Sequence, residues 1–87
     1  MDAQALRQQV KAMILEELDL RDRSAADIVD DAPLFGEGLG LDSLDALQLA
    51  MAIEERFGVV IPEGDEARAI FASVSAIAEH IARARAA

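Results

Sequence analysis

The chain has 87 residues and a formal net charge of -9, from 17 acidic and 8 basic side chains. This length suits one small domain over residues 1–87 and leaves no room for a second, catalytic domain, while the acidic balance argues against nucleic acid and anionic membrane surfaces and favours basic protein partners. The complete lack of cysteine excludes disulfides, thiolate metal sites and a side-chain thiol nucleophile.

The N-terminal segment lacks the basic and apolar regions of a signal peptide, and no apolar run approaches the roughly 18 residues of a membrane span. We therefore expect a cytoplasmic protein without membrane insertion. We also expect a monomer that does not bind nucleic acid.

The apolar pattern of residues 3–18 predicts the first helix. Arg7, Lys11 and Glu17 are expected on its solvent-exposed sides. The residues expected to face the core recur at spacings of three and four: Leu6, Val10, Met13, Ile14 and Leu18.

Residues 19–41 show no sustained period and are rich in aspartate and glycine, which predicts a long acidic loop. Long ordered loops are uncommon in small domains and are often functional. The apolar side chains expected to hold this loop against the core are Ile28, Val29, Leu34, Phe35 and Leu39.

The end of the loop carries the strongest local signal. Three glycines at alternate positions in residues 36–40 prevent regular structure, and Asp42 is then a favourable N-cap, with Asp45 able to complete a weaker capping box. This predicts a helix over residues 43–57 that begins at Ser43. The serine hydroxyl is expected to be exposed at the positive helix end, where unpaired backbone N–H groups favour a phosphate. Asp-Ser-Leu-Asp is also an ordinary helix start, so these four residues alone leave a purely capping role open.

Two apolar stripes run along the predicted helix 43–57. The pattern alone leaves open whether the second stripe is buried or exposed, because singly exposed leucines are common. The first stripe, expected to face the core, is Ala46, Leu49, Ala50, Ile53 and Phe57. The second stripe is Leu44, Leu47 and Met51, and it is bordered by Gln48, Glu54 and Glu55.

The remaining sequence predicts two further helices. Gly58 is expected to end the preceding helix in a left-handed cap, before an extended segment over residues 59–62. A short helix is expected to start at Gly64 or Asp65. Ser73 then caps a last helix with the buried stripe Val74, Ile77, Ala78 and Ile81. The whole pattern predicts an all-α fold, a small antiparallel-type bundle of three main helices and one short helix with a long first loop.

Other chemistry is poorly supported. The glycine spacing departs from dinucleotide and P-loop motifs, and one histidine cannot make a common zinc site. His80 is expected at the surface or at a boundary, and it is the sole ordinary base for Ser43 as a nucleophile, a role we do not favour. The group Asp27, Asp30 and Asp31 lacks the spacing of an EF-hand. We therefore expect no catalytic residue, no metal site and no enzyme activity.

The longer string around Ser43 resembles the acyl carrier protein family. It reads Gly-Leu-Gly-Leu-Asp-Ser-Leu-Asp-Ala-Leu-Gln-Leu over residues 38–49, and Ile-Glu-Glu-Arg-Phe-Gly-Val follows at residues 53–59. The resemblance runs over residues 34–81 and implies an acyl-carrier-protein-like helical bundle. It further implies that 4′-phosphopantetheine is joined to Ser43 and holds acyl intermediates as thioesters for fatty-acid, polyketide or polyene-type enzymes. Family members can also tuck the acyl chain between their helices.

The resemblance also implies a set of partners. These are a phosphopantetheinyl transferase, which uses coenzyme A, and acyl ligase, acyltransferase and ketosynthase-type enzymes with basic docking patches. In the family, the helix that follows the modified serine is the recognition surface. On this chain the residues expected to bind partners are Asp42, Leu44, Asp45, Leu47, Gln48, Met51, Glu54 and Glu55.

The sequence is compatible with more than one kind of carrier. Carriers of primary fatty-acid synthesis usually show Leu-Gly-Ala-Asp-Ser-Leu and an acid at the position of Gln48. Here residues 34–41 read Leu-Phe-Gly-Glu-Gly-Leu-Gly-Leu, which is more similar to accessory carriers and favours a specialised free-standing carrier. A free-standing aminoacyl or peptidyl carrier is the near alternative. An alternative of another class is an unmodified acidic interaction module, in which Ser43 only caps a helix.

Overall fold

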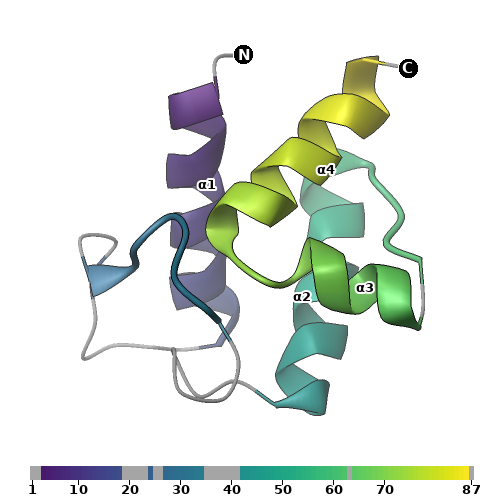
Figure 1. Ribbon diagram of the computed structural model, residues 1–87, viewed down its shortest axis with the longest axis horizontal. Helices are drawn as coiled ribbons and strands as arrows, with labels where there is room; N and C mark the ends of the chain where they lie inside the picture. The colour runs from purple at the N-terminus through teal and green to yellow at the C-terminus, as the bar shows by residue number, and fades with distance from the viewer. Residues whose placement is uncertain (1–2, 19–23, 25–26, 35–41, 63, 87) are drawn as a thin grey trace.

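The computed structural model describes residues 3–18, 24, 27–34, 42–62 and 64–86, and this part of the chain contains four helices. They are α1 (Ala3–Glu17), α2 (Ser43–Phe57), α3 (Asp65–Ile70) and α4 (Val74–Ala86). In Figure 1, α1 and α2 run in opposite directions, α4 crosses in front of them, and the first turn of α1 lies at the same end of the bundle as the last turn of α4. The structure confirms the all-α bundle of three main helices and one short helix, with a long connection between α1 and α2. None of the described helices combines the length and the apolar character that a bilayer crossing requires.

The predicted apolar stripes of α1 and α4 form most of the core. Every predicted core residue of α4 is buried, and so are four of the five on α1, while Leu18 packs against the core from a half-buried position. Helix α1 packs mainly on α4 and also on α2. Full burial of a valine, leucine, isoleucine or methionine side chain contributes about 1.5–3 kcal/mol to the stability of the fold. The fully buried side chains are Val10, Met13, Ile14, Leu34, Leu49, Ile53, Val74, Ile77 and Ile81.

Lys11 is buried, with 7% of its surface exposed, so its expected place on a solvent-exposed side of α1 is wrong. Its ammonium lies 2.6 Å from Asp30 Oδ1, and Arg7 Nε, one turn earlier on α1, lies 3.1 Å from Asp30 Oδ2. A buried ammonium is costly unless it is paired with an anion. The carboxylate comes from the loop between α1 and α2, and helical periodicity cannot reveal such a partner.

The described part of that loop is held by two of the expected apolar side chains. Ile28 and Leu34 are buried, as predicted. Val29 is 62% exposed, so its predicted role as a core contact is wrong. Its neighbour Ile28 already occupies the buried side of this turn. Phe35 and Leu39 lie outside the described residues.

Two long-range backbone hydrogen bonds tie the same loop segment to the other end of the chain. The carbonyl of Asp30 accepts from the N–H of Ser75, at 2.9 Å, in the first turn of α4. The N–H of Leu34 donates to the carbonyl of Ala72, at 3.4 Å, just before α4. Residues 30–34 therefore bridge α1 and the start of α4.

The predicted caps delimit α2, α3 and α4. Gly58 adopts φ 69° and ψ 24°, and its N–H donates to the carbonyl of Glu54 at 3.0 Å, which confirms the left-handed cap. Gly64 precedes α3 with φ 84°, a region that favours glycine. Ser73 Oγ accepts from the N–H of Ala76 at 3.1 Å and caps α4 as predicted.

Candidate functional site

The predicted capping box is present at the start of α2. Asp42 has an extended conformation, and its Oδ1 accepts from the backbone N–H groups of Leu44 and Asp45, both at 3.0 Å. Asp45 Oδ2 accepts in return from the N–H of Asp42 at 3.0 Å. Ser43 is the first residue of α2, directly after the N-cap. The expected exposure of its hydroxyl lies outside what the structure describes.

The capping box changes the expected electrostatics of this helix end. We expected unpaired N–H groups that favour a phosphate, but the N–H groups of Leu44 and Asp45 already donate to the carboxylate of Asp42. The carboxylates of Asp42 and Asp45 also lie within one turn of the helix start, and their negative charge disfavours a bound anion. The described geometry therefore provides an exposed helix start, since Asp42 and Leu44 are both exposed, and not a strong anion-binding pocket.

The structure resolves the open question about the two stripes of α2. Leu49 and Ile53 are fully buried, and the other members of the first stripe pack against the core from half-buried positions, as predicted. The second stripe is exposed: Leu44 at 75%, Leu47 at 60% and Met51 at 57%. The stripe is thus an apolar strip on the surface, and the partner role expected for it depends on this exposure.

The polar residues expected on the partner surface differ in their surroundings. Glu54 and Glu55 are exposed, whereas Asp45 is half-buried within the capping box. The amide of Gln48 is exposed but donates a hydrogen bond to the backbone carbonyl of Glu17 at the end of α1. Gln48 therefore connects α2 to α1, a contact that the sequence analysis did not foresee.

A second contact joins the same ends of α1 and α2. Arg56 Nη2 lies 2.8 Å from Glu16 Oε2 and 3.0 Å from Glu17 Oε1. The hydrogen bond from Arg56 to Glu16, supported by the charges of both carboxylates, raises the pKa of the guanidinium, which stays charged. The partners lie about forty residues apart in sequence, and no local pattern signals the pairing.

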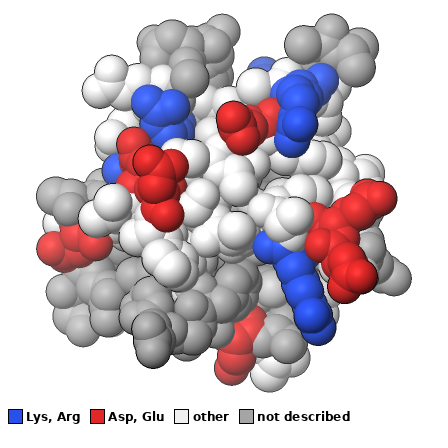
Figure 2. Space-filling view, viewed as in Figure 1, with Lys and Arg blue, Asp and Glu red and all other residues white. Residues whose placement is uncertain are grey.

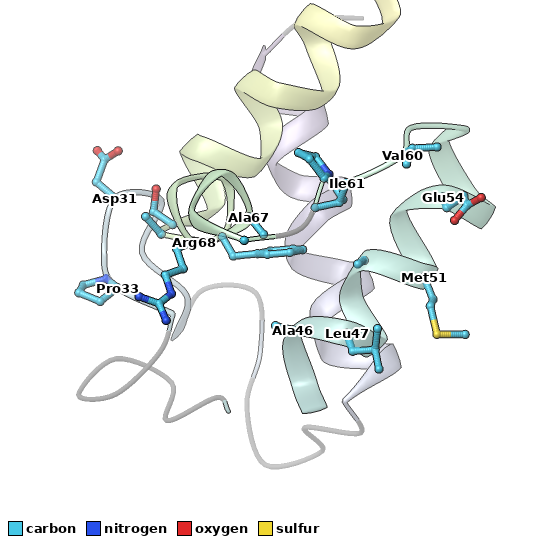
Figure 3. A pocket seen from close by; sticks show the side chains of 16 residues that line it. Asp31, Pro33, Ala46, Leu47, Met51, Glu54, Val60, Ile61, Ala67 and Arg68 are labelled. Carbon is cyan, nitrogen blue, oxygen red and sulfur yellow. The ribbon is translucent and has the colours of Figure 1, made fainter. Parts of the chain in front are cut away.

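A groove of about 1000 Å³ lies beside α2 (Figure 3). Its walls come from α2, the extended segment 59–62, α3 and residues 31–33 of the first loop. The described residues that line it are Asp31, Pro33, Ala46, Leu47, Ala50, Met51, Glu54, Val60, Ile61, Pro62, Gly64, Ala67, Arg68, Phe71, Ala72 and Ser73. Most are apolar. No local sequence pattern predicts that these residues line a groove, because their convergence depends on the packing of α3.

The groove and the expected partner surface share part of their residues. Leu47, Met51 and Glu54 belong to both, whereas Leu44 belongs to the exposed stripe alone. Figure 2 shows that acidic and basic groups lie next to one another in places on the viewed face, with uncharged surface between these clusters. His80 is half-buried on α4, as predicted for a boundary position.

A family model described as a phosphopantetheine attachment site matches residues 8–81. The chain belongs to the acyl carrier protein family. The acyl carrier protein of Sulfurovum sp. (strain NBC37-1) is 42% identical over 66 residues, which is 76% of this chain and 81% of that protein. The acyl carrier protein of Helicobacter pylori (strain G27) is 44% identical over 59 residues, 68% of this chain and 70% of that protein. This acyl carrier protein is thus a non-catalytic carrier of acyl groups on a phosphopantetheine arm, and it interacts with a phosphopantetheinyl transferase and with biosynthetic enzymes.

The described residues of this acyl carrier protein fit such an arm. Asp42 and Leu44, on either side of Ser43, are exposed. The groove begins at Ala46, less than one turn of α2 beyond Ser43, and continues along Leu47 and Ala50. The start of α2 thus lies close to one end of an apolar groove.

Proposed function

We propose that Ser43 carries the 4′-phosphopantetheine of this acyl carrier protein. The observation that carries the proposal is the position of Ser43 at an exposed helix start that leads into the groove. Asp42, and not Ser43, supplies the N-cap acceptor, so capping alone does not account for a serine here. The three other serines have different surroundings: Ser73 caps α4, Ser24 lies in a turn with Asp27, and Ser75 is half-buried in the first turn of α4.

The arm supplies a terminal thiol that holds acyl groups as thioesters, a group that the cysteine-free chain lacks. The part of the chain that receives the acyl group is the apolar groove between α2 and α3. Its volume is at the upper end of the roughly 300–1000 Å³ of small-molecule sites. Ala50, Ile61 and Phe71 offer apolar surface there, and an alkyl chain placed on them leaves water.

The exposed stripe Leu44, Leu47 and Met51 is the surface that we assign to partner enzymes. Glu54 and Glu55 border it with negative charge, so a partner with an apolar patch and a rim of Arg or Lys is complementary. Such partners include the transferase that attaches the arm and acyl ligase, acyltransferase and ketosynthase-type enzymes. We assign the remaining expected residues, Asp42, Asp45 and Gln48, to the edge of this surface.

Within the family, this chain has the features of a specialised carrier. Gln48 stands where carriers of primary fatty-acid synthesis usually have an acid, and its amide donates to the carbonyl of Glu17. An ionised glutamate at this position has no donor for that carbonyl. Enzymes that read an acid at this position are expected to bind this carrier less well.

The attachment is tested by the intact mass of the protein after incubation with coenzyme A and a broad-specificity phosphopantetheinyl transferase. One phosphopantetheine increment is expected on the native chain and on Ser75→Ala, a matched control in α4. The Ser43→Ala variant is expected to show none. An increment that persists in Ser43→Ala, or none on the native chain, overturns the assignment. Loading by an acyl ligase, and not by an adenylating amino-acid enzyme, separates the acyl carrier from the aminoacyl alternative.

A further inference from the structure

One basic side chain of the groove has no partner among the residues that the structure describes. Arg68, on α3, is the sole basic side chain among the described residues that line the groove. Its guanidinium forms no ion pair and no hydrogen bond with the described residues. Arg7, Lys11 and Arg56, in contrast, each pair with a carboxylate of a neighbouring element. No described residue therefore occupies the five N–H donors of the Arg68 guanidinium, and an oxygen of a ligand in the groove can accept from them.

The side chain of Arg68 reaches along one side of the groove. In Figure 3 it runs from α3 toward the side formed by Pro33, while Met51, Glu54 and Val60 lie on the opposite side. The carboxylate of Asp31 points away from the guanidinium in this view. The groove thus combines apolar walls with a hydrogen-bond donor on one side.

The charges around Arg68 restrict the kind of group that it accepts. A saturated chain gains no hydrogen bond from the guanidinium, whereas an oxygen on the chain accepts one with a charged donor. A carboxylate on the chain is disfavoured, because Asp31 and Glu54 also line the groove and the protein has a net charge of -9. A neutral hydroxyl or keto oxygen meets the donor without that repulsion.

We propose that Arg68 makes the groove selective for acyl groups that carry a hydroxyl or keto oxygen on the chain, over saturated chains of equal length. The proposal rests on the proposed function, in which the groove receives the acyl chain. Amide carbonyls of the arm have the same acceptor chemistry as the chain oxygen. The test must therefore compare different chains on the same arm and include the arm without a chain.

The first experiment measures how well the groove shelters a loaded thioester. The holo-protein is loaded with octanoyl or with hydroxyoctanoyl chains that have the hydroxyl near the thioester, in mid-chain or at the end. The rate of cleavage by hydroxylamine is then compared between the native chain and Arg68→Gln, separately for each chain. For at least one hydroxylated chain we expect Arg68→Gln to speed cleavage by about three-fold, a modest factor because Arg68 is exposed, with no change for octanoyl. Arg83→Gln, an exposed arginine on α4 outside the lining of the groove, is the matched control and is expected to change neither.

The outcomes separate this inference from the proposed function. Equal effects of Arg68→Gln on saturated and hydroxylated chains, or no effect on any chain, overturn the selectivity while the carrier function stands. Cleavage of every chain at the rate of a free acyl-pantetheine shows that the groove does not shelter cargo, and overturns both the selectivity and the assignment of the groove to the acyl chain, while attachment of the arm at Ser43 is decided by the mass measurement alone. A second readout is the NMR signal of the Arg68 side-chain Nε–H. It is expected to shift with a hydroxylated chain, and an equal shift with the unacylated arm overturns the proposal by locating the acceptor in the arm.

Discussion

Leu44 and Met51 lie on the same exposed stripe of α2, but only Met51 also lines the groove. A glutamate at either position adds a charge to the expected partner surface. Leu44→Glu is expected to weaken binding of a partner enzyme by roughly 10-fold, the effect of losing a moderately important interface residue, and to leave thioester shelter unchanged. Met51→Glu is expected to impair both partner binding and thioester shelter, because it also adds a charge to the apolar groove. A binding titration measures the effect on partner binding. The rate of hydroxylamine cleavage of an octanoyl thioester measures the effect on thioester shelter.

Helix content by circular dichroism is the control for this pair of variants. Because Leu44 and Met51 are both more than half exposed, neither change is expected to unfold α2. Equal partner binding by the native chain and Leu44→Glu would contradict the assignment of the stripe. Loss of shelter in Leu44→Glu would show that the groove extends beyond its present boundary.

Removal of the N-cap acceptor is expected to destabilise the protein. Asp42→Ala leaves the N–H groups of Leu44 and Asp45 without their acceptor, at a cost of about 1 kcal/mol in unfolding free energy. Asp45→Ala removes the single reciprocal bond to the N–H of Asp42 and is expected to cost less. Urea unfolding of both variants gives the comparison. A larger loss in Asp45→Ala would show that the half-buried Asp45 matters mainly through other contacts.

The ion pairs of Asp30 predict a pH-dependent contribution to stability. The hydrogen bond from Lys11, reinforced by the charges of Lys11 and Arg7, lowers the pKa of the Asp30 carboxyl in the folded state. A lowered folded-state pKa stabilises the protein above the unfolded value of about 4, and the contribution is lost as the pH falls through the folded-state value. Asp30→Asn is therefore expected to lower Tm at neutral pH, and the difference from the native chain is expected to shrink below about pH 4.

Glu79→Gln provides the charge-matched control for Asp30→Asn. Glu79 is exposed on α4 and forms no ion pair within the described part of the chain. This control is expected to leave Tm at neutral pH nearly unchanged. A Tm difference for Asp30→Asn that stays constant down to pH 2 would show that the carboxylate charge is not the source of its effect.

Gln48→Glu exchanges the donor at the junction of α1 and α2 for an acid. The variant loses the hydrogen bond to the carbonyl of Glu17 and adds a negative charge next to Glu16 and Glu17. We expect a loss of about 1 kcal/mol in unfolding free energy, which added salt reduces through screening. Binding to an enzyme of primary fatty-acid synthesis is expected to improve. Salt-dependent thermal melts and a binding titration test the two effects, and a more stable variant would contradict the first.

The sequence predicted those features of the fold that depend on neighbours three or four residues apart. The stripes of α1, α2 and α4 and the caps at Asp42, Gly58 and Ser73 follow from local spacing, and the structure confirms them. The family resemblance added the proposal that Ser43 is the attachment site. Local spacing did not decide whether Leu47 and Met51 were buried, because that depends on which helix packs beside them.

The features that the sequence analysis missed are contacts between distant segments. The pairing of Lys11 with Asp30 and the bond from Gln48 to Glu17 join residues on different elements. A lysine within an amphipathic pattern is normally solvent-exposed, and only the carboxylate of the loop makes its burial tolerable. Arg68 likewise has the sequence pattern of an ordinary surface residue, and its position in the groove follows only from the packing of α3 beside α2.

The packing of α1 on α4 has a consequence for synthesis of the chain. Helix α1 is made first, but its main packing partner spans Val74–Ala86, near the other end of the sequence. At about 5–20 residues per second, a ribosome needs on the order of 3 to 14 seconds to proceed from the end of α1 to the end of α4. During that interval the apolar face of α1 has no α4 to cover it. The nascent chain therefore offers chaperones a hydrophobic helix that the finished carrier hides.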